Sequence, residues 1–98
     1  MSARILVVDD IEANRRLLQA KLEAQYHSVI LASSGPQALE MAKLHDPEII
    51  LLDVMMPGMD GYEVCRRLKA DPVTAHIPVV MVTALSDSED RVRGLDAL

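Results

Sequence analysis

The chain has 98 residues, enough for one domain, and its formal net charge is -5, so a nucleic-acid-binding surface of clustered Lys and Arg is not expected. The N-terminus lacks the apolar segment of a signal peptide, and no apolar run approaches the roughly 20 residues that span a membrane. Half of the residues are hydrophobic, and the single cysteine cannot form an internal disulfide. These features fit an aliphatic core in a reducing, cytoplasmic location.

The chain begins with a strand pattern followed by a helix pattern. Residues 4–8 form a β-branched run closed by Asp9 and Asp10, which predicts a buried strand with two carboxylates at its C-terminal end. Residues 11–25 then follow a helical period. The inward stripe of this helix is predicted to contain Leu18 and Leu22. Its water-facing charged residues are predicted to be Arg15, Arg16, Lys21 and Glu23.

A second strand and helix follow. Residues 27–32 read as a weaker strand. Ser34 is a predicted N-cap for the next helix, and Gln37 completes a capping box with it. Pro36 suits the first turn of this helix, and Pro47 stops it at about residue 45.

The second half of the chain repeats the alternation. Residues 49–53 are an apolar run that ends in Asp53, and a turn follows at once. A helix is predicted over 62–70, a strand over 77–83 and a last helix from about residue 86 to the end. The core-facing residues of the helix over 62–70 are predicted to be Tyr62, Cys65 and Leu68.

Strict alternation of strand and helix predicts an α/β fold, a doubly wound parallel sheet with right-handed crossovers and helices on both faces. All strands of a parallel sheet end at one edge, where open α/β folds place their ligands. Three carboxylates and one hydroxyl are therefore expected to converge there: Asp9, Asp10, Asp53 and Thr83.

Clustered carboxylates repel one another unless a divalent cation lies between them, and Mg²⁺ prefers a few carboxylates with waters and a phosphate oxygen. We therefore expect a Mg²⁺ site open to phosphate, with Asp53 as a nucleophile that forms an acyl phosphate. Simpler readings exist for three of these four residues, but not for Asp9. Asp10 can be the N-cap of the first helix, Asp53 a turn residue and Thr83 an ordinary strand residue. Cys65 and three dispersed histidines read as structural or surface residues. These histidines are His27, His45 and His76.

Three segments together resemble a response-regulator receiver domain: residues 5–10, 51–61 and 78–84. The resemblance implies a flavodoxin-like fold in which Asp53 accepts a phosphoryl group from a histidine kinase or phosphotransfer protein. It further implies Mg²⁺ ligation by both N-terminal aspartates, Asp53 and the backbone carbonyl of Met55. In the same way it makes Thr83 the switch hydroxyl and Ala84 a small residue beside the phosphate.

The sequences of residues 8–14 and 64–69 are similar to those of the N-terminal receiver of PleD-type regulators, which carry a diguanylate cyclase output domain. The resemblance therefore implies an output domain or effector protein as a partner. The family has a fifth strand with a phosphate-pairing lysine and a fifth helix, and no Lys follows Lys69 here. We expect residues 1–98 to be a receiver domain that is incomplete at its C-terminus.

Two consequences of this departure are expected. Mg²⁺ binding persists while phosphorylation is impaired, and the exposed edge of the strand over 77–83 promotes a homodimer or swapped oligomer. Two alternative functions stay open. One is a receiver-like interaction module that does not use phosphate. The other is a Mg²⁺-dependent phosphohydrolase with Asp53 as nucleophile, which is weaker because the haloacid dehalogenase type wants an aspartate where Met55 stands.

Overall fold

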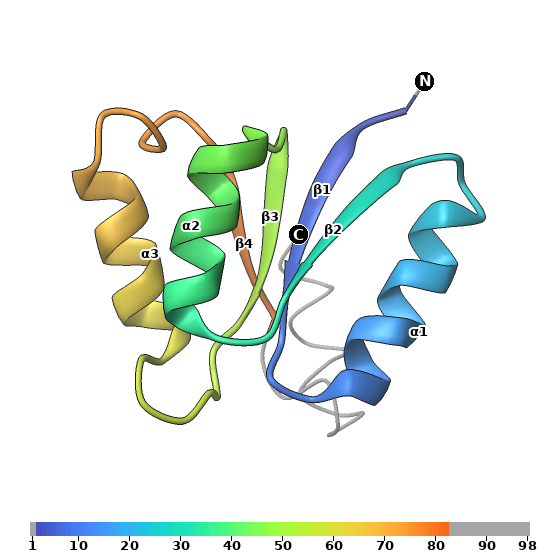
Figure 1. Ribbon diagram of the computed structural model, residues 1–98, viewed down its shortest axis with the longest axis horizontal. Helices are drawn as coiled ribbons and strands as arrows, with labels where there is room; N and C mark the ends of the chain where they lie inside the picture. The colour runs from blue at the N-terminus through green and yellow to red at the C-terminus, as the bar shows by residue number, and fades with distance from the viewer. Residues whose placement is uncertain (1, 83–98) are drawn as a thin grey trace.

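The computed structural model describes residues 2–82, which fold into four parallel strands and three helices in strict alternation (Figure 1). The strands are β1 (Arg4–Val8), β2 (Ser28–Ala32), β3 (Ile49–Asp53) and β4 (Val79–Val82). The helices are α1 (Glu12–Glu23), α2 (Gly35–His45) and α3 (Gly61–Ala70). The predicted alternation and parallel sheet are confirmed for these residues, and the helix predicted from residue 86 lies outside them.

The strand order in the sheet is β2-β1-β3-β4, so β1 and β3 are the two central strands. Because β1 to β2 and β2 to β3 run in opposite directions across the sheet, right-handed crossovers place α1 on one face and α2 and α3 on the other. Figure 1 shows α2 and α3 side by side, with α1 set apart from them beside β2. The fold is therefore doubly wound, as predicted.

The main core lies between the sheet and the pair α2 and α3. Leu6, Ile50 and Leu52 are fully buried on the strands, and each such side chain contributes about 1.5–3 kcal/mol by leaving water. The small residues Ala38 and Ala42 on α2 are also buried, which lets this helix approach the sheet closely. Both central strands thus pack along their length, as their apolar sequences predict.

The opposite face is covered less completely. No residue of α1 is fully buried, and Leu18 and Leu22 are only partly buried. Helix α1 packs against β1 and β2. The turn that carries Asp9 and Asp10 connects the end of β1 to the start of α1 on this face of the sheet.

Two details of the helices differ from the predictions. Ser34 Oγ accepts from Gln37 N at 3.3 Å as predicted, but Gln37 Oε1 accepts from Ser33 N at 2.6 Å, so the returning bond lies one residue earlier. The prediction for Tyr62 is wrong, because its side chain is 55% exposed. The buried stripe of α3 is made by Gly61, Val64 and Leu68. At about 100° per residue, Tyr62 lies well to one side of that stripe.

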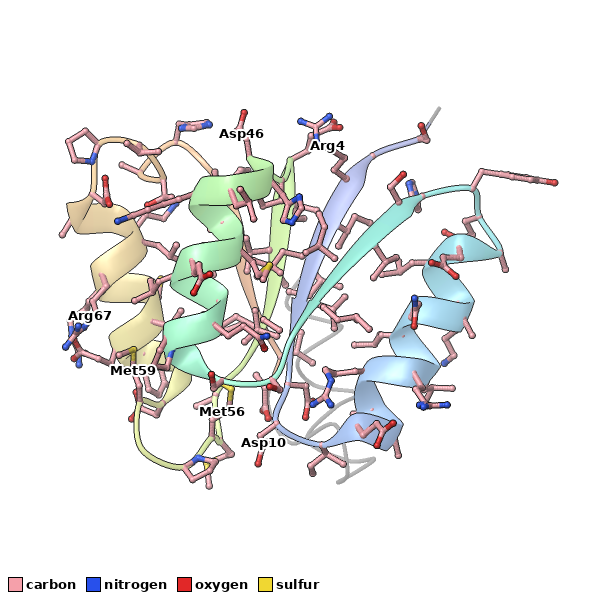
Figure 2. All side chains as sticks on the ribbon, in the orientation of Figure 1. Arg4, Asp10, Asp46, Met56, Met59 and Arg67 are labelled. Atoms are coloured by element: carbon pink, nitrogen blue, oxygen red, sulfur yellow. The ribbon has the colours of Figure 1, made fainter. Side chains whose placement is uncertain are left out.

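The two ends of the sheet have different polar residues (Figure 2). At the end where the strands begin, Arg4 Nη2 donates to the carbonyl oxygen of Asp46 at 2.9 Å. Asp10 lies at the opposite end, where the strands finish. No helix within residues 2–82 combines the length and the apolar character that crossing a membrane requires.

Candidate functional site

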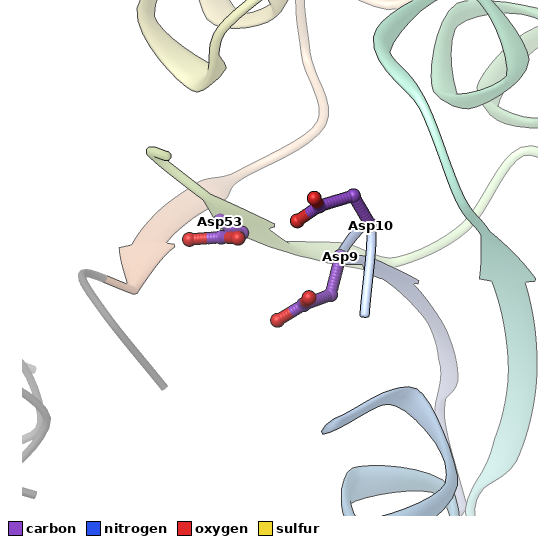
Figure 3. A group of neighbouring side chains, drawn as sticks. All are labelled: Asp9, Asp10 and Asp53. Atoms are coloured by element: carbon purple, nitrogen blue, oxygen red, sulfur yellow. The ribbon is translucent and has the colours of Figure 1, made fainter. Parts of the chain in front are cut away.

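Two neighbouring strands bring three carboxylates together. Asp9 and Asp10 directly follow β1, and Asp53 is the last residue of β3. Since Val8 pairs with Leu52, the residues that follow them lie side by side at the C-terminal edge of the sheet. One carboxylate oxygen from each of the three aspartates lies within 4.8 Å of the others (Figure 3). The predicted convergence of these aspartates is therefore present.

Asp9 is fully buried and its carboxylate is held by protein donors. Oδ1 accepts from Ile11 N at 2.8 Å, and Oδ2 accepts from Asn14 Nδ2 at 3.3 Å. Burial raises the pKa of Asp9 above its ordinary value. The two donors, and Arg15 nearby, oppose that rise, while the neighbouring Asp10 adds to it.

Asp53 is only 4% exposed at the end of its strand. Burial raises its pKa to about 6, and the charges of Asp9 and Asp10 add to the rise. The N–H of Met55 donates to Asp53 Oδ1 at 3.2 Å and favours the ionised form. The Asp53 carboxyl group therefore loses its proton at a higher pH than an ordinary aspartate does.

Asp10 is partly exposed, yet its Oδ1 is buried and has no hydrogen-bond partner among the described residues. It does not cap the first helix. The N-cap of α1 is Ile11, without any side-chain cap bond, and it is Asp9 that accepts from the Ile11 N–H. The simpler reading of Asp10 as an N-cap is therefore wrong, and its buried oxygen is left without a protein donor within residues 2–82.

The donor set fits a hard divalent cation. It contains carboxylate oxygens alone, three of them close together, and one is buried without a partner. Mg²⁺ favours such oxygens, and a cation among them would offset the repulsion that raises the pKa of Asp53. Asp9, Asp10 and Asp53 are the residues that can hold it.

The other predicted site residues fall at different places. Met55 lies two residues after Asp53 with its side chain 71% exposed, and its backbone N–H faces the cluster. Thr83 and Ala84 lie outside the described residues. Cys65 is partly buried and packs against the core, as expected for a small hydrophobic residue.

Two polar residues of α1 contact Asp9, although these contacts were not predicted from the sequence. Arg15 was expected to face water, but its Nη1 donates to the backbone carbonyl oxygen of Asp9 at 2.7 Å, so that prediction is wrong. Asn14 donates to the Asp9 carboxylate. The useful signal was the spacing of five and six residues after Asp9, because long side chains near a helix start point back toward its N-terminus.

An open hollow lies along the loop between β3 and α3, which begins directly after Asp53. Its lining residues are Val54, Met55, Met56, Pro57, Asp60 and Tyr62. Met55 and Tyr62 expose apolar surface there, next to the end of β3. The part of this lining that directly follows Asp53 in the sequence, residues 54–57, is therefore apolar.

The sequence matches the response regulator receiver domain family over residues 5–97. It is 66% identical over 97 residues to the response regulator PleD of Caulobacter vibrioides, a match that covers 99% of this chain and 21% of that protein. It is 44% identical to the alkaline phosphatase synthesis transcriptional regulatory protein PhoP of Bacillus subtilis, over 98% of this chain and 39% of that protein. The chain thus spans well under half the length of these curated relatives.

Solved structures give the same picture of the fold. The N-terminal domain of a response regulator receiver protein from Methanoculleus marisnigri superposes with a TM-score of 0.83 at 37% identity, covering 97% of this chain and 77% of that one. The Vibrio cholerae chemotaxis protein CheY4 gives 0.81 at 27% identity, covering 98% and 80%. The flavodoxin-like arrangement predicted from the sequence is therefore shared with these proteins.

Proposed function

The chain belongs to the response regulator receiver domain family, a signalling domain of two-component systems, and we propose that Asp53 is the residue that accepts the phosphoryl group. The observation that carries this proposal is the position of Asp53. It is a buried carboxylate at the end of a central strand, with the Asp9 and Asp10 carboxylates close by. A nucleophile placed in this way faces the edge of the sheet where ligands of such folds bind.

The proposed donor is a phosphohistidine of a histidine kinase or phosphotransfer protein. An Asp53 oxygen forms a bond to phosphorus as the bond from phosphorus to the imidazole nitrogen breaks. The products are an acyl phosphate on Asp53 and an imidazole that takes up a proton from solvent. Met55 and Tyr62 expose apolar surface along the loop that follows Asp53, which supports approach of a protein donor there.

Asp9, Asp10 and Asp53 are proposed to hold Mg²⁺, together with the backbone carbonyl of Met55. When bound, the ion supplies positive charge that offsets the carboxylates and the incoming phosphate. The chain's own contribution is to keep Asp9 oriented through Ile11 N and Asn14, and to hold Asp53 through Met55 N. Thr83 as the switch hydroxyl and Ala84 beside the phosphate complete the proposed site.

The remaining parts of the proposal concern the longer context. Residues 1–98 are proposed to act as a receiver unit in the cytoplasm, signalling to an output domain or effector protein. The 66% identity to PleD supports an output of that type, which in the proposal is cyclic diguanylate synthesis by a separate domain.

Intact mass measurement after incubation with acetyl phosphate and Mg²⁺ tests the acceptor. We expect a gain of one phosphoryl group in the unmodified chain and none in Asp53→Asn. Asp60→Asn is the matched control. Asp60 caps α3 through a bond from Glu63 N at 2.9 Å, a role that Asn keeps, and it lies outside the carboxylate cluster. Phosphorylation that survives Asp53→Asn would remove Asp53 as the acceptor and favour a different site.

A further inference from the structure

Asp9 is the most completely held of the three carboxylates. Its backbone N–H donates to the carbonyl oxygen of Ala32 at 3.1 Å, and its own carbonyl oxygen accepts from Arg15 Nη1 at 2.7 Å. Both of its carboxylate oxygens accept hydrogen bonds as well, from Ile11 N and Asn14 Nδ2. Every polar atom of this buried residue therefore has a partner, whereas Asp10 Oδ1 has none within the described part of the chain.

Hydrogen bonds at the start of α1 join Asp9, Ile11, Asn14 and Arg15 into one network. The backbone N–H groups of Asn14 and Arg15 both donate to the carbonyl oxygen of Ile11, each at 3.1 Å. Ile11 N in turn donates to Asp9 Oδ1, and the side chains of Asn14 and Arg15 return to Asp9. Rotation of the Asp9 side chain would break at least two of these bonds. The helix start therefore sets the direction of this carboxylate.

We propose that Asn14 and Arg15 are positioning residues that hold Asp9 in the orientation in which it can ligate a divalent cation. This inference rests on the proposed metal site and adds to it the residues that set its affinity. Each carboxylate oxygen has more than one lone pair, so one bond from the protein leaves room for a cation. Removal of a residue that hydrogen-bonds to a metal ligand typically lowers the metal affinity by about 10–100-fold.

A charge effect alone makes the opposite prediction for Arg15. Its guanidinium is a positive charge beside a cation site, and removing it would strengthen the attraction for a divalent ion. Loss of the hydrogen bond to the Asp9 backbone would instead loosen the ligand and weaken binding. The sign of the change in affinity therefore separates positioning from simple electrostatics.

Mn²⁺ binding, followed by the electron paramagnetic resonance signal of the free ion, is the direct test. The variants are Arg15→Met, which keeps the apolar stem, and Asn14→Leu, which removes the amide without changing charge. For both we expect the Mn²⁺ dissociation constant to rise by about 10-fold. The matched control is Arg16→Met on the same helix. Arg16 is exposed and pairs with Glu12 at 2.7 Å, so its replacement is expected to change the constant by less than about twofold.

The results that overturn the inference are specific. A constant that is unchanged or lower in Arg15→Met, or unchanged in Asn14→Leu, overturns it. Urea unfolding in EDTA is measured beside binding, and a lower midpoint with unchanged affinity also overturns it, because that is the pattern of a structural role alone. If Arg15→Met does not fold, Arg15→Lys and Asn14→Ser replace the pair, with weaker binding again expected. Failure of the unmodified chain to bind Mn²⁺ would overturn the metal site itself, which is a distinguishable outcome.

Discussion

At the scale of single residues, the surroundings of Asp53 make its carboxyl group harder to ionise than that of an ordinary aspartate. Its carboxylate is buried and lies close to two others, and both effects raise its pKa to about 6. Asp53 is therefore still mostly ionised at neutral pH without a cation, but its ionisation costs more free energy in the folded chain than in the unfolded chain. The fold maintains this group at some cost to stability, as is common where a residue has a chemical task.

Asp53→Asn is expected to stabilise the metal-free chain at pH 7.5 by roughly 1–3 kcal/mol. The folded state raises the pKa of Asp53 from 3.8 to about 6. The stability that protonated Asp53 contributes to the folded chain is thus fully present below pH 3.8, and it is lost as the pH rises through about 6. Urea unfolding in EDTA between about pH 4 and pH 7.5 measures the difference in free energy of unfolding between Asp53→Asn and the unmodified chain. This difference should shrink toward zero below about pH 4.

Two companion measurements sharpen this prediction. Asp60→Asn, in the loop before α3, should show no such pH-dependent gain, because the carboxyl group it replaces is exposed. Added Mg²⁺ should stabilise the unmodified chain by mass action and have little effect on Asp53→Asn. A variant that is less stable than the unmodified chain at pH 7.5 in EDTA would contradict the prediction.

The sequence located the carboxylates but not the residues that hold them. Asp9, Asp10 and Asp53 were predictable because a parallel sheet gathers its strand ends, and each follows an apolar run. Arg15 was assigned to water because a periodicity argument places charged residues by angle alone. It cannot see a long side chain reach back past its own helix start to a backbone carbonyl.

At the scale of elements, the ends of the helices carry the local strain. Helix α1 ends in a turn where Tyr26 has φ of +69°, a left-handed conformation that is usually taken by Gly. Tyr26 N donates to the Glu23 carbonyl oxygen at 2.9 Å, and His27 N donates to that of Leu22 at 3.1 Å. The turn is well bonded, yet its central residue is a strained and exposed tyrosine.

Tyr26→Gly is expected to stabilise the chain by roughly 0.5–1 kcal/mol, because glycine relieves the strain of a positive φ at this position. Thermal or urea unfolding measures the gain. Tyr26→Ala is the control, since it removes the same exposed ring but keeps the strain, and it should give no gain. Equal stabilisation by both variants would show that the ring, and not the backbone, is responsible.

Helix α3 begins in direct contact with the backbone at the end of β3, the strand that ends in Asp53. Gly61 N donates to the Val54 carbonyl oxygen at 3.0 Å. A Cβ at this position would stand 2.8 Å from Val54 Cα and would collide with the Asp53 carbonyl oxygen. The absence of a side chain at residue 61 is therefore what lets the helix meet the end of β3.

Gly61→Ala is expected to destabilise the chain by roughly 1–3 kcal/mol, although alanine is the better helix former. The collision is with backbone atoms that cannot rotate away. Gly35→Ala is the comparison, because the atoms that its Cβ would approach most closely are side-chain atoms of Met59, at 2.8–2.9 Å, and not backbone atoms at the end of a central strand. Unfolding experiments should rank Gly61→Ala as the more costly change, and the reverse order would contradict this account.

At the scale of the whole molecule, the sheet determines what the chain can bind. Within residues 2–82, β4 pairs with β3 alone, so the other edge of β4 has no strand beside it in that range. The partly exposed apolar side chains of this strand, Val80 among them, make such an edge a site for pairing with another chain.

The isolated chain is therefore expected to self-associate, and sedimentation velocity over a range of concentrations measures this. Val80→Lys should lower the association, because a charged side chain on an edge strand opposes pairing. Val73→Lys, in the exposed loop before β4, is the control and should leave association unchanged. A stable monomer of the unmodified chain at high concentration would contradict the prediction.

The order of strands and helices was predictable across the described residues, because buried parallel strands read as apolar runs and Pro and Gly mark their limits. The inward face of α3 was predictable only in part, because Leu68 is buried and Cys65 packs against the core as predicted, but Tyr62 is exposed. A three-residue spacing drifts around a helix, and the fully buried stripe is made by Gly61, Val64 and Leu68. Short helices leave too few turns for a pattern alone to choose between such stripes.

The pairing of β3 with β4 connects the position of Asp53 to the edge of the sheet. Asp53 lies opposite Val82, and the N–H of Val54 donates to the Val82 carbonyl oxygen at 3.4 Å. This bond is long for a sheet and lies just beyond the pair of Asp53 with Val82, the last pair of the two strands within residues 2–82. A change in the charge of the Asp53 side chain would thus occur one peptide unit away from a long hydrogen bond to the end of β4. We expect this bond to be among the first contacts of the sheet to respond to such a change.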